Sequence, residues 1–423
     1  MQSERAALRP LDQAALALVA LVGEYSLLIM PFILGAMMDS NHLSETRAGQ
    51  LISLQLLAMA IASVAVSVKL RAGQSVRPLL AVAISAICLA NILCTLPVSP
   101  AVFAGARVLT GLGEGAVMSA AAAAVCATTD PHRVFSLIGT AVAVVAALAL
   151  VATPWLVEHA GPRGVFWLLA AVPLLLLPML PRVPILARAS ESSFGLIPRG
   201  VRARAAGLLF AFLLLWCGAS GLWVYAERIG TYQGLSVQQV GLWLGIGQLA
   251  GVAGPLAAVW GAPRLGSRVS LVAGSFGMAI AAVCFVFGGT AWLYGIGSCL
   301  ASFWIMFVVP CFRSTMAGLD GSGRTVAASA GFYTVGFGVA PLAVAAITTE
   351  GQGYAPTGIF CCVCFVLSAA LAAGLRASAP VEDRHAATPA ADRHAAAAPT
   401  TEPHTAVAQA NENSSRGLSR IND

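Results

Sequence analysis

Long apolar stretches, almost free of charged residues, follow one another from Ala14 to Leu375. A bilayer core is about 30 Å thick, and a helix needs about 20 apolar residues to cross it. Only helices and closed barrels satisfy their own backbone hydrogen bonds in lipid. The stretches are unbroken and do not alternate polar with apolar residues, so they predict helices. We therefore expect an all-α membrane protein.

The composition agrees with this fold class. Hydrophobic residues make up 58% of the chain and charged residues 10%, against about 45–50% and 25% in soluble domains. The apolar stretch that begins at Ala14 is too long for a cleavable signal, so none is expected. The net charge of +6 comes from basic residues scattered over loops, which argues against a nucleic-acid partner.

The apolar stretches predict twelve transmembrane helices. An even number of helices places both termini on the same side of the membrane. The expected bounds are 14–38, 48–68, 77–97, 100–128, 134–157, 164–186, 204–227, 237–261, 268–288, 290–312, 324–348 and 355–376.

The distribution of Lys and Arg predicts which side that is. With the N-terminus inside, 20 of the 24 basic residues fall in cytoplasmic segments. The outer loops contain only Arg47, Arg163 and Arg228, and Arg107 lies within the membrane. Because cytoplasmic loops are enriched in Lys and Arg, we expect both termini in the cytoplasm and the protein in the plasma membrane, the inner membrane of a bacterium.

The chain is expected to divide into two six-helix halves, 1–186 and 204–376, joined by a basic cytoplasmic loop at 187–203. The halves repeat: Leu43-Ser44 opens the second helix, and Leu235-Ser236 opens the eighth helix 192 residues later. The basic turns at 69–77 and 261–268 match at a similar offset. Repeats with an even number of helices are parallel, related by an axis along the membrane normal.

The remaining segment, 377–423, is rich in Ala, Pro and Thr. It has too little apolar surface to fold, so we expect a disordered cytoplasmic tail. All ten cysteines lie in apolar stretches and show no CxxC spacing. Small apolar packing is therefore their expected role, and we expect no cofactor and no metal site.

These features together resemble the major facilitator superfamily of transporters over residues 12–376. The stretch Arg107-Val-Leu-Thr-Gly111-Leu-Gly113 resembles the superfamily's Arg-x-x-x-Gly-x-Gly motif. The loop from Gly254 to Arg268 resembles its Gly-x-x-x-Asp-Arg-x-Gly-Arg-Arg signature, but Ala258 replaces the Asp. The resemblance implies that the loop residues Lys69, Arg71, Arg77, Arg264 and Arg268 take part in gating. The missing Asp puts the usual gating ion pairs in doubt.

Charged groups inside the membrane are costly and mark functional sites. Glu24 lies about halfway along the first helix, and Arg107 and Glu114 are seven residues apart, hence on one face of the fourth. In this superfamily the first, fourth, seventh and tenth helices line the central cavity. We expect at least one of Glu24 and Glu114 to carry a coupling proton, and Arg107 either to contact an anionic substrate or to reset the protonation of that carboxylate. A structural alternative pairs Arg107 with helix backbone or with Glu24.

Aromatic and amide side chains supply further substrate-binding candidates. Trp216 and Trp223 share a face of the seventh helix and precede Glu227-Arg228. They form either an interfacial aromatic belt beside a surface ion pair or one wall of the cavity. The other candidates are Tyr25, Gln248, Tyr294, Trp304 and Tyr333.

These observations favour a secondary active transporter of a small organic solute, which we expect to be proton-coupled and monomeric and to work by alternating access. The chain has no Gly-x-x-x-x-Gly-Lys-Ser/Thr loop for ATP, no intramembrane His for an embedded enzyme, and a tandem repeat that a channel does not need. Two alternatives remain: a drug or metabolite efflux pump of the same fold, and a transporter-like receptor without net transport. An organic anion is one candidate substrate because of Arg107.

Overall fold

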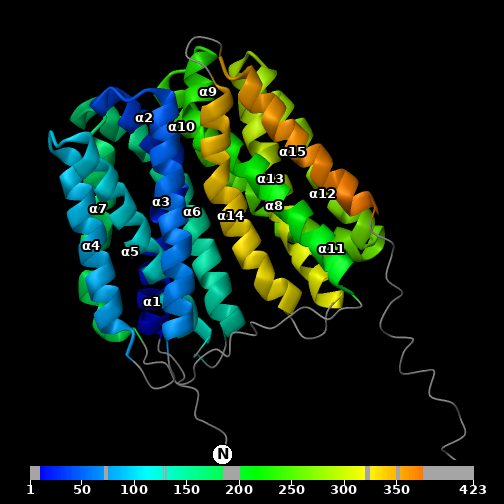
Figure 1. Ribbon diagram of the computed structural model, residues 1–423, viewed down its shortest axis with the longest axis horizontal. Helices are drawn as coiled ribbons and strands as arrows, with labels where there is room; N and C mark the ends of the chain where they lie inside the picture. Colours follow the sequence, from blue (N-terminus) through cyan, green and yellow to red (C-terminus); the bar gives the residue numbers. More distant parts are fainter. Residues whose placement is uncertain are drawn as a thin grey trace, which may run out of the picture. The chain divides into compact units, whose positions relative to one another are not determined.

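The computed structural model describes residues 10–70, 75–126, 128, 131–183, 201–319, 324–348 and 353–374. Within these ranges the chain forms helices and no strands (Figure 1). The helices are α1 (Pro10–Leu28), α2 (Met30–Asn41), α3 (Glu45–Lys69), α4 (Arg77–Thr95), α5 (Pro100–Cys126), α6 (Pro131–Ala160), α7 (Gly164–Leu176), η1 (Leu177–Arg182), α8 (Arg202–Val224), α9 (Ala226–Tyr232), α10 (Val237–Gly251), α11 (Ala253–Leu265), α12 (Ser267–Phe287), α13 (Ala291–Leu319), α14 (Arg324–Ile347) and α15 (Ala355–Gly374).

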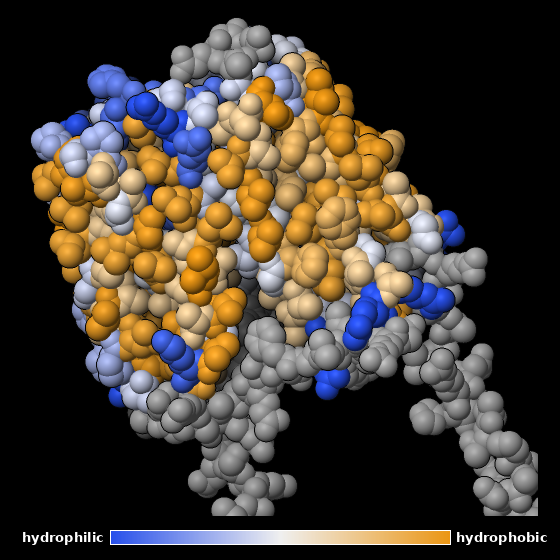
Figure 2. Space-filling model, in the orientation of Figure 1, coloured by the Kyte–Doolittle hydropathy of each residue, from blue (hydrophilic) through white to orange (hydrophobic). Residues whose placement is uncertain are grey.

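Twelve of the described spans are long and apolar enough to cross a membrane. Each corresponds to one of the twelve helices expected from the sequence, so that prediction is confirmed. Large apolar side chains such as Ile61, Val82 and Leu175 are exposed, and apolar residues cover the middle of the molecule in Figure 2. The protein is therefore a multi-pass integral membrane protein.

The first and seventh spans are interrupted at comparable positions. Ile29 separates α1 from α2, and its φ of −109° and ψ of 17° are not helical. Tyr225 separates α8 from α9 with a φ of −94° and a ψ of 5°. Beyond each break a short helix continues at the same end of the bundle, where α2 and α9 contact each other. We call this the closed end.

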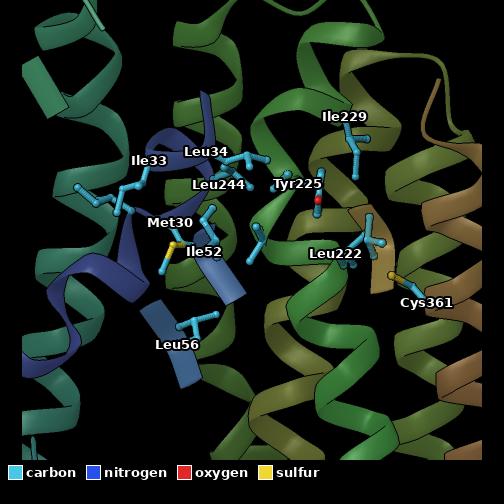
Figure 3. Packing of buried hydrophobic residues seen from close by; sticks show 14 of the residues in the cluster. Met30, Ile33, Leu34, Ile52, Leu56, Leu222, Tyr225, Ile229, Leu244 and Cys361 are labelled. Atoms are coloured by element: carbon cyan, nitrogen blue, oxygen red, sulfur yellow. The ribbon is translucent and has the colours of Figure 1, made fainter. Parts of the chain in front are cut away.

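The first six spans and the last six spans meet along two pairs of helices, α3 with α14 and α6 with α10. Much of the contact at the closed end is apolar. Met30, Ile33 and Leu34 of α2 belong to one buried cluster with Leu222, Tyr225 and Ile229 (Figure 3). Each Å² of apolar surface that such a contact removes from water stabilises it by about 25 cal/mol.

The opposite end, where α1 begins, is the open end. There α3 and α14 diverge in Figure 1, and the surface between them is hollowed in Figure 2. Val64 and Val68, near the end of α3, are 52% and 65% exposed. Gly331, in the first turns of α14, has no neighbouring atom within 4 Å of the point where a β-carbon would lie. A cavity between the two sets of spans therefore opens toward this end.

One helix extends further than the sequence suggested. We expected the tenth span to end at 312, but α13 continues to Leu319. Arg313 consequently lies within a helix and is exposed there. The reason is that Arg313, Ser314 and Thr315 do not break a helix, and Thr315 donates a hydrogen bond to the Cys311 carbonyl one turn earlier, at 2.8 Å.

All the described helices belong to one compact unit, Met1–Ala377. Most of the central loop expected at 187–203 and the whole tail expected at 377–423 lie outside the described residues.

Candidate functional site

Arg107 lies in the middle of a polar network inside the first six spans. Its side chain is 0% exposed. Its guanidinium donates to Gln55 Oε1 at 2.6 and 3.2 Å, and to Asn91 Oδ1 at 2.9 Å. It also lies 5.6 Å from the centre of the Phe166 ring. The structural alternative of a bond to Glu24 or to helix backbone is not what is observed, since two amide oxygens from α3 and α4 solvate the charge.

Gln55 connects Arg107 to Glu114. Its Oε1 accepts from Arg107, so its Nε2 is free to donate, and it donates to Glu114 Oε2 at 3.0 Å and to Ser26 Oγ at 3.3 Å. Glu114 is 2% exposed. Arg107 and Glu114 thus face the same side of α5, as their spacing predicted, and one amide bridges them. The network spans α1, α3, α4 and α5.

Glycines of α5 make this bridge possible. A β-carbon at Gly111 would collide with the Gln55 carbonyl, and one at Gly115 would collide with the Met59 carbonyl. Because both positions lack a side chain, the backbone of α3 lies directly against α5. Arg107 and Gly111 of the Arg-x-x-x-Gly-x-Gly pattern, with Gly115 one turn later, therefore serve the polar network and helix packing together.

Glu24 has a different environment. It lies on α1 and is only partly buried, and within the described part of the chain it forms no hydrogen bond or ion pair. Tyr333 of α14 lies within electrostatic reach of both Glu24 and Arg313 of α13. Glu24 and Tyr333 belong to different sets of spans, so the Glu24 carboxyl lies on the side of α1 that is turned toward the last six spans.

An aromatic cluster forms part of the wall contributed by the last six spans. The ring centres of Trp216 and Tyr333 are 4.5 Å apart in an edge-on arrangement, and Phe337 lies 6.0 Å from Trp216. Trp216 Nε1 has no hydrogen-bond partner among the described residues. This N–H is buried as well as unpaired.

The other aromatic candidates lie elsewhere. Trp223 Nε1 donates to the Leu27 carbonyl at 2.8 Å, which links α8 to α1. Tyr294 is 0% exposed and donates to the Ala226 carbonyl at 2.9 Å. Trp304 packs against Gly277 of α12 and against Phe307.

Tyr25 is buried, and Gln248 is partly buried on α10. Of the candidate gating residues, Lys69, Arg264 and Arg268 are exposed, and Arg77 donates to the Val183 carbonyl at 2.9 Å. Arg71 lies outside the described residues.

A second polar cluster lies at the closed end, and sequence reasoning had named only two of its members, Glu227 and Arg228. Arg228 of α9 pairs with Asp39 of α2 at 2.8 Å and with Glu227 at 3.1 Å. The Glu227 and Arg228 side chains are only 6% and 17% exposed. The interpretation of a surface ion pair is therefore wrong. The sequence signal was the pair of opposite charges, Asp39 and Arg228, at matching ends of the first and seventh spans.

The residues from 14 to 319 match the family model of the Major Facilitator Superfamily. The chain belongs to this superfamily. A comparison with curated protein sequences found no significant match.

Solved structures show that this superfamily member has the fold of known transporters. It is similar to a mutant of the nucleoside transporter NupG, with a TM-score of 0.68, 12% identity, and coverage of 86% of this chain and 97% of that chain. It is also similar to the D-xylose–proton symporter, with a TM-score of 0.63, 13% identity, and coverage of 84% of this chain and 96% of that chain. A mutant of the peptide transporter POT in complex with alafosfalin has a TM-score of 0.67, 12% identity, and coverage of 85% of this chain and 93% of that chain.

Proposed function

We propose that this chain is a proton-coupled secondary transporter of a small organic solute, and that Glu24 carries the coupling proton. The observation that carries the proposal is the position of Glu24, an unpaired carboxylate on the wall of a cavity between the two sets of spans. Membrane insertion scales give a cost of about 2.5–3.5 kcal/mol for a charged side chain at the helix centre. A carboxylate that alternates between water and a closed interior therefore has a reason to bind and release a proton.

Glu114 is the second candidate for proton carriage, but its surroundings suit a different role. It is buried, it accepts a hydrogen bond from Gln55, and the same amide contacts the Arg107 charge. An ionised Glu114 makes this network neutral overall. We therefore assign the coupling proton to Glu24. Glu114 and Arg107 stabilise the packing of α1, α3, α4 and α5 against one another.

The aromatic cluster in the last six spans favours a solute with an apolar face. Trp216, Tyr333 and Phe337 supply its aromatic surface. Arg107 is fully buried in this conformation, so an anionic group on the solute would meet Arg313 instead, which is exposed and near Tyr333.

With the N-terminus inside, as the distribution of basic residues predicts, the open end faces the cytoplasm. The described conformation is then the inward-facing state of an alternating-access cycle. Both termini would lie in the cytoplasm, and the membrane would be the plasma membrane.

The test is proton movement driven by solute in proteoliposomes with a pH-sensitive dye trapped inside. A panel of small organic acids, amphiphilic drugs and neutral metabolites is added outside, one at a time. We expect at least one solute to acidify the lumen. Glu24→Gln should abolish this signal while keeping solute exchange, because exchange needs no net proton movement. The exposed carboxylate variant Glu158→Gln should behave like the parent.

Three other results would change the assignment. Lumen alkalinisation on solute entry indicates antiport and hence an efflux pump. Solute entry with no proton signal, and unaffected by Glu24→Gln, contradicts proton coupling. Solute binding without any flux indicates a transporter-like receptor.

A further inference from the structure

The polar cluster at the closed end joins the two sets of spans through a single cation. Arg228 of α9 contacts Asp39 of α2 at 2.8 Å and donates to the Gly35 carbonyl of α2 at 2.7 Å. Its Nε lies 3.1 Å from Glu227 Oε2. Two carboxylates therefore share one guanidinium at the contact between α2 and α9. These two helices must separate if the cavity is to open at this end.

The two carboxylates are not equivalent. The Asp39 side chain is 50% exposed and makes a short contact with Arg228. The Glu227 side chain is 6% exposed, and its Oε2 accepts no hydrogen bond from any described residue. A buried carboxylate that lacks hydrogen bonds to this oxygen is poorly stabilised in its ionised form. Residues close to Gly35 and Glu227 along the chain, among them Ile33, Leu34 and Ile229, belong to the buried apolar cluster (Figure 3).

The burial of Glu227 depends on closure of this end. Gly35 of α2 packs on the Glu227 carboxyl so closely that a β-carbon there would lie 2.7 Å from Oε2. If α2 and α9 separate, Glu227 loses this cover and meets water. The same carboxyl is thus desolvated in the closed arrangement and solvated in the open one.

We propose that Glu227 is a second proton-binding site, which takes up a proton when α2 and α9 meet and releases it when they separate. The proposal rests on the alternating access of the proposed function, but not on the identity of the solute or on the role of Glu24. On the predicted topology, this site exchanges protons with the outer aqueous phase.

The charges around Glu227 determine in which direction its pKa shifts. Burial raises the pKa of Glu227 to about 7, a shift opposed by Arg228 and reinforced by Asp39. The other titratable groups facing it are Tyr294 of α13 and Tyr354 before α15, and Glu45 of α3 acts on Tyr354 in turn.

A group whose pKa is raised in the closed state stabilises that state below its ordinary pKa. This contribution is lost as the pH rises through about 7. Acid on this side therefore favours closure. For a shift from about 4.3 to about 7, the ratio of open to closed molecules rises about tenfold between pH 6 and pH 8.

Hydrogen–deuterium exchange of the native-sequence protein tests this without solute or pH gradient. The readout is exchange of the backbone amides of α2 and α9, compared between proteins at the same pH so that chemical exchange rates cancel. At both pH values Glu227→Gln should be more protected than the parent, because only a side chain that can ionise favours the open, solvated arrangement. Between pH 6 and pH 8 the excess exchange of the parent over Glu227→Gln should grow about tenfold.

Two matched variants complete the design. Glu158→Gln changes an exposed carboxylate of α6 that also contacts the other set of spans, through Gln238 at 2.9 Å, and should follow the parent at both pH values. Asp39→Asn removes the short ion pair but keeps Glu227. It should raise exchange at both pH values and keep a pH dependence, which should be smaller than in the parent because Asp39 reinforces the raised pKa of Glu227.

Equal exchange of the parent and Glu227→Gln at pH 8 overturns the proposal. So does a pH dependence that persists in Glu227→Gln but disappears in Asp39→Asn, which would place the proton on Asp39. Neither result bears on proton-coupled flux in proteoliposomes, so failure here is distinct from failure of the proposed function.

Discussion

At the scale of single residues, the buried Arg107 differs from the usual buried cation. No carboxylate oxygen of a described residue lies within ion-pair distance of it, since the ion pairs found there all involve Arg228. Instead of a carboxylate, two amide oxygens and one aromatic ring face surround the guanidinium. Guanidinium suits such a site because its fixed fork of donors reaches Gln55 and Asn91 together. Gln55 links it to the buried carboxyl of Glu114.

This arrangement predicts a large effect of Arg107→Ala on stability. The variant leaves the Glu114 carboxylate buried without a compensating charge, which should lower the free energy of unfolding by about 3–5 kcal/mol. Thermal or denaturant unfolding in detergent measures it. The exposed Arg47→Ala should lie within about 0.5 kcal/mol of the parent.

A double variant checks the cause of that loss. Arg107→Ala combined with Glu114→Gln removes both charges, so it should be more stable than the sum of the two single effects predicts. Simple additivity would mean that the two charges do not interact through Gln55.

The sequence predicted one part of this network and not the rest. Residues seven apart on a helix must share a face, so the pairing of Arg107 with Glu114 followed from spacing alone. Gln55 and Asn91 lie on other helices, and their contacts depend on how closely α3 and α4 approach α5. Likewise Glu227 looked like a surface residue because nothing in its neighbourhood along the chain shows that α2 covers it.

At the scale of helices, α3 and α5 pack backbone to backbone where α5 carries Gly111 and Gly115. The same helix also contains Gly105, which has open space where a side chain would lie. The three positions therefore separate two effects of glycine. A glycine in a helix interior costs about 0.5–1 kcal/mol relative to alanine, whereas a glycine at a helix contact permits packing that a larger residue would disrupt.

We expect Gly115→Ala to destabilise the protein by about 1–3 kcal/mol, because its β-carbon would overlap the Met59 carbonyl. Gly105→Ala should be neutral or stabilising by up to about 1 kcal/mol. Unfolding of the two variants in the same detergent compares them. If both behave alike, the close approach of α3 and α5 does not depend on Gly115.

The helix breaks show the limit of sequence reasoning at this scale. Pro31 follows the break at Ile29, but a proline in the first turn of a helix is also compatible with a continuous span. Tyr225 has no proline or glycine beside it. Its conformation is fixed by contacts distant in sequence, including the hydrogen bond from its hydroxyl to the Pro341 carbonyl at 3.2 Å. Such a break becomes visible only when α8 and α14 are seen together.

At the scale of the whole molecule, twelve spans and the superfamily were predictable because hydrophobic length and tandem repetition are properties of the sequence itself. The orientation stays a prediction that labelling can test. In a variant without native cysteines, His42→Cys at the closed end should react with an impermeant thiol reagent on intact cells. Arg268→Cys, at an exposed position in the first turn of α12, should react only after permeabilisation. The reverse pattern would invert the topology.

The gap between α3 and α14 at the open end predicts how the molecule moves. The two helices already touch where Gly49 meets Pro341 and Ala345, and where Leu57 meets Gly338. Two helical turns further toward the open end on each helix, the same faces carry Val64 on α3 and Gly331 on α14. In this conformation Val64 is exposed, and no atom lies within 4 Å of the point where a β-carbon of Gly331 would lie. If the closed end opens by rocking the two sets of spans, Val64 and Gly331 should come together.

A Val64→Cys/Gly331→Cys pair in the same cysteine-free background should therefore cross-link slowly with a short thiol reagent when the closed end is intact. Adding Asp39→Asn, which weakens the Arg228 contact at the far end, should speed the cross-link, because opening one end and closing the other are the same motion. Mass spectrometry of the linked peptides measures the rate. The control pair is Val82→Cys with Gly331→Cys, where Val82 is 69% exposed on α4. Its rate of cross-linking should not change when Asp39→Asn is added. A cross-link that forms at one rate with and without Asp39→Asn would mean that the two ends move independently, which is incompatible with rocking of rigid halves.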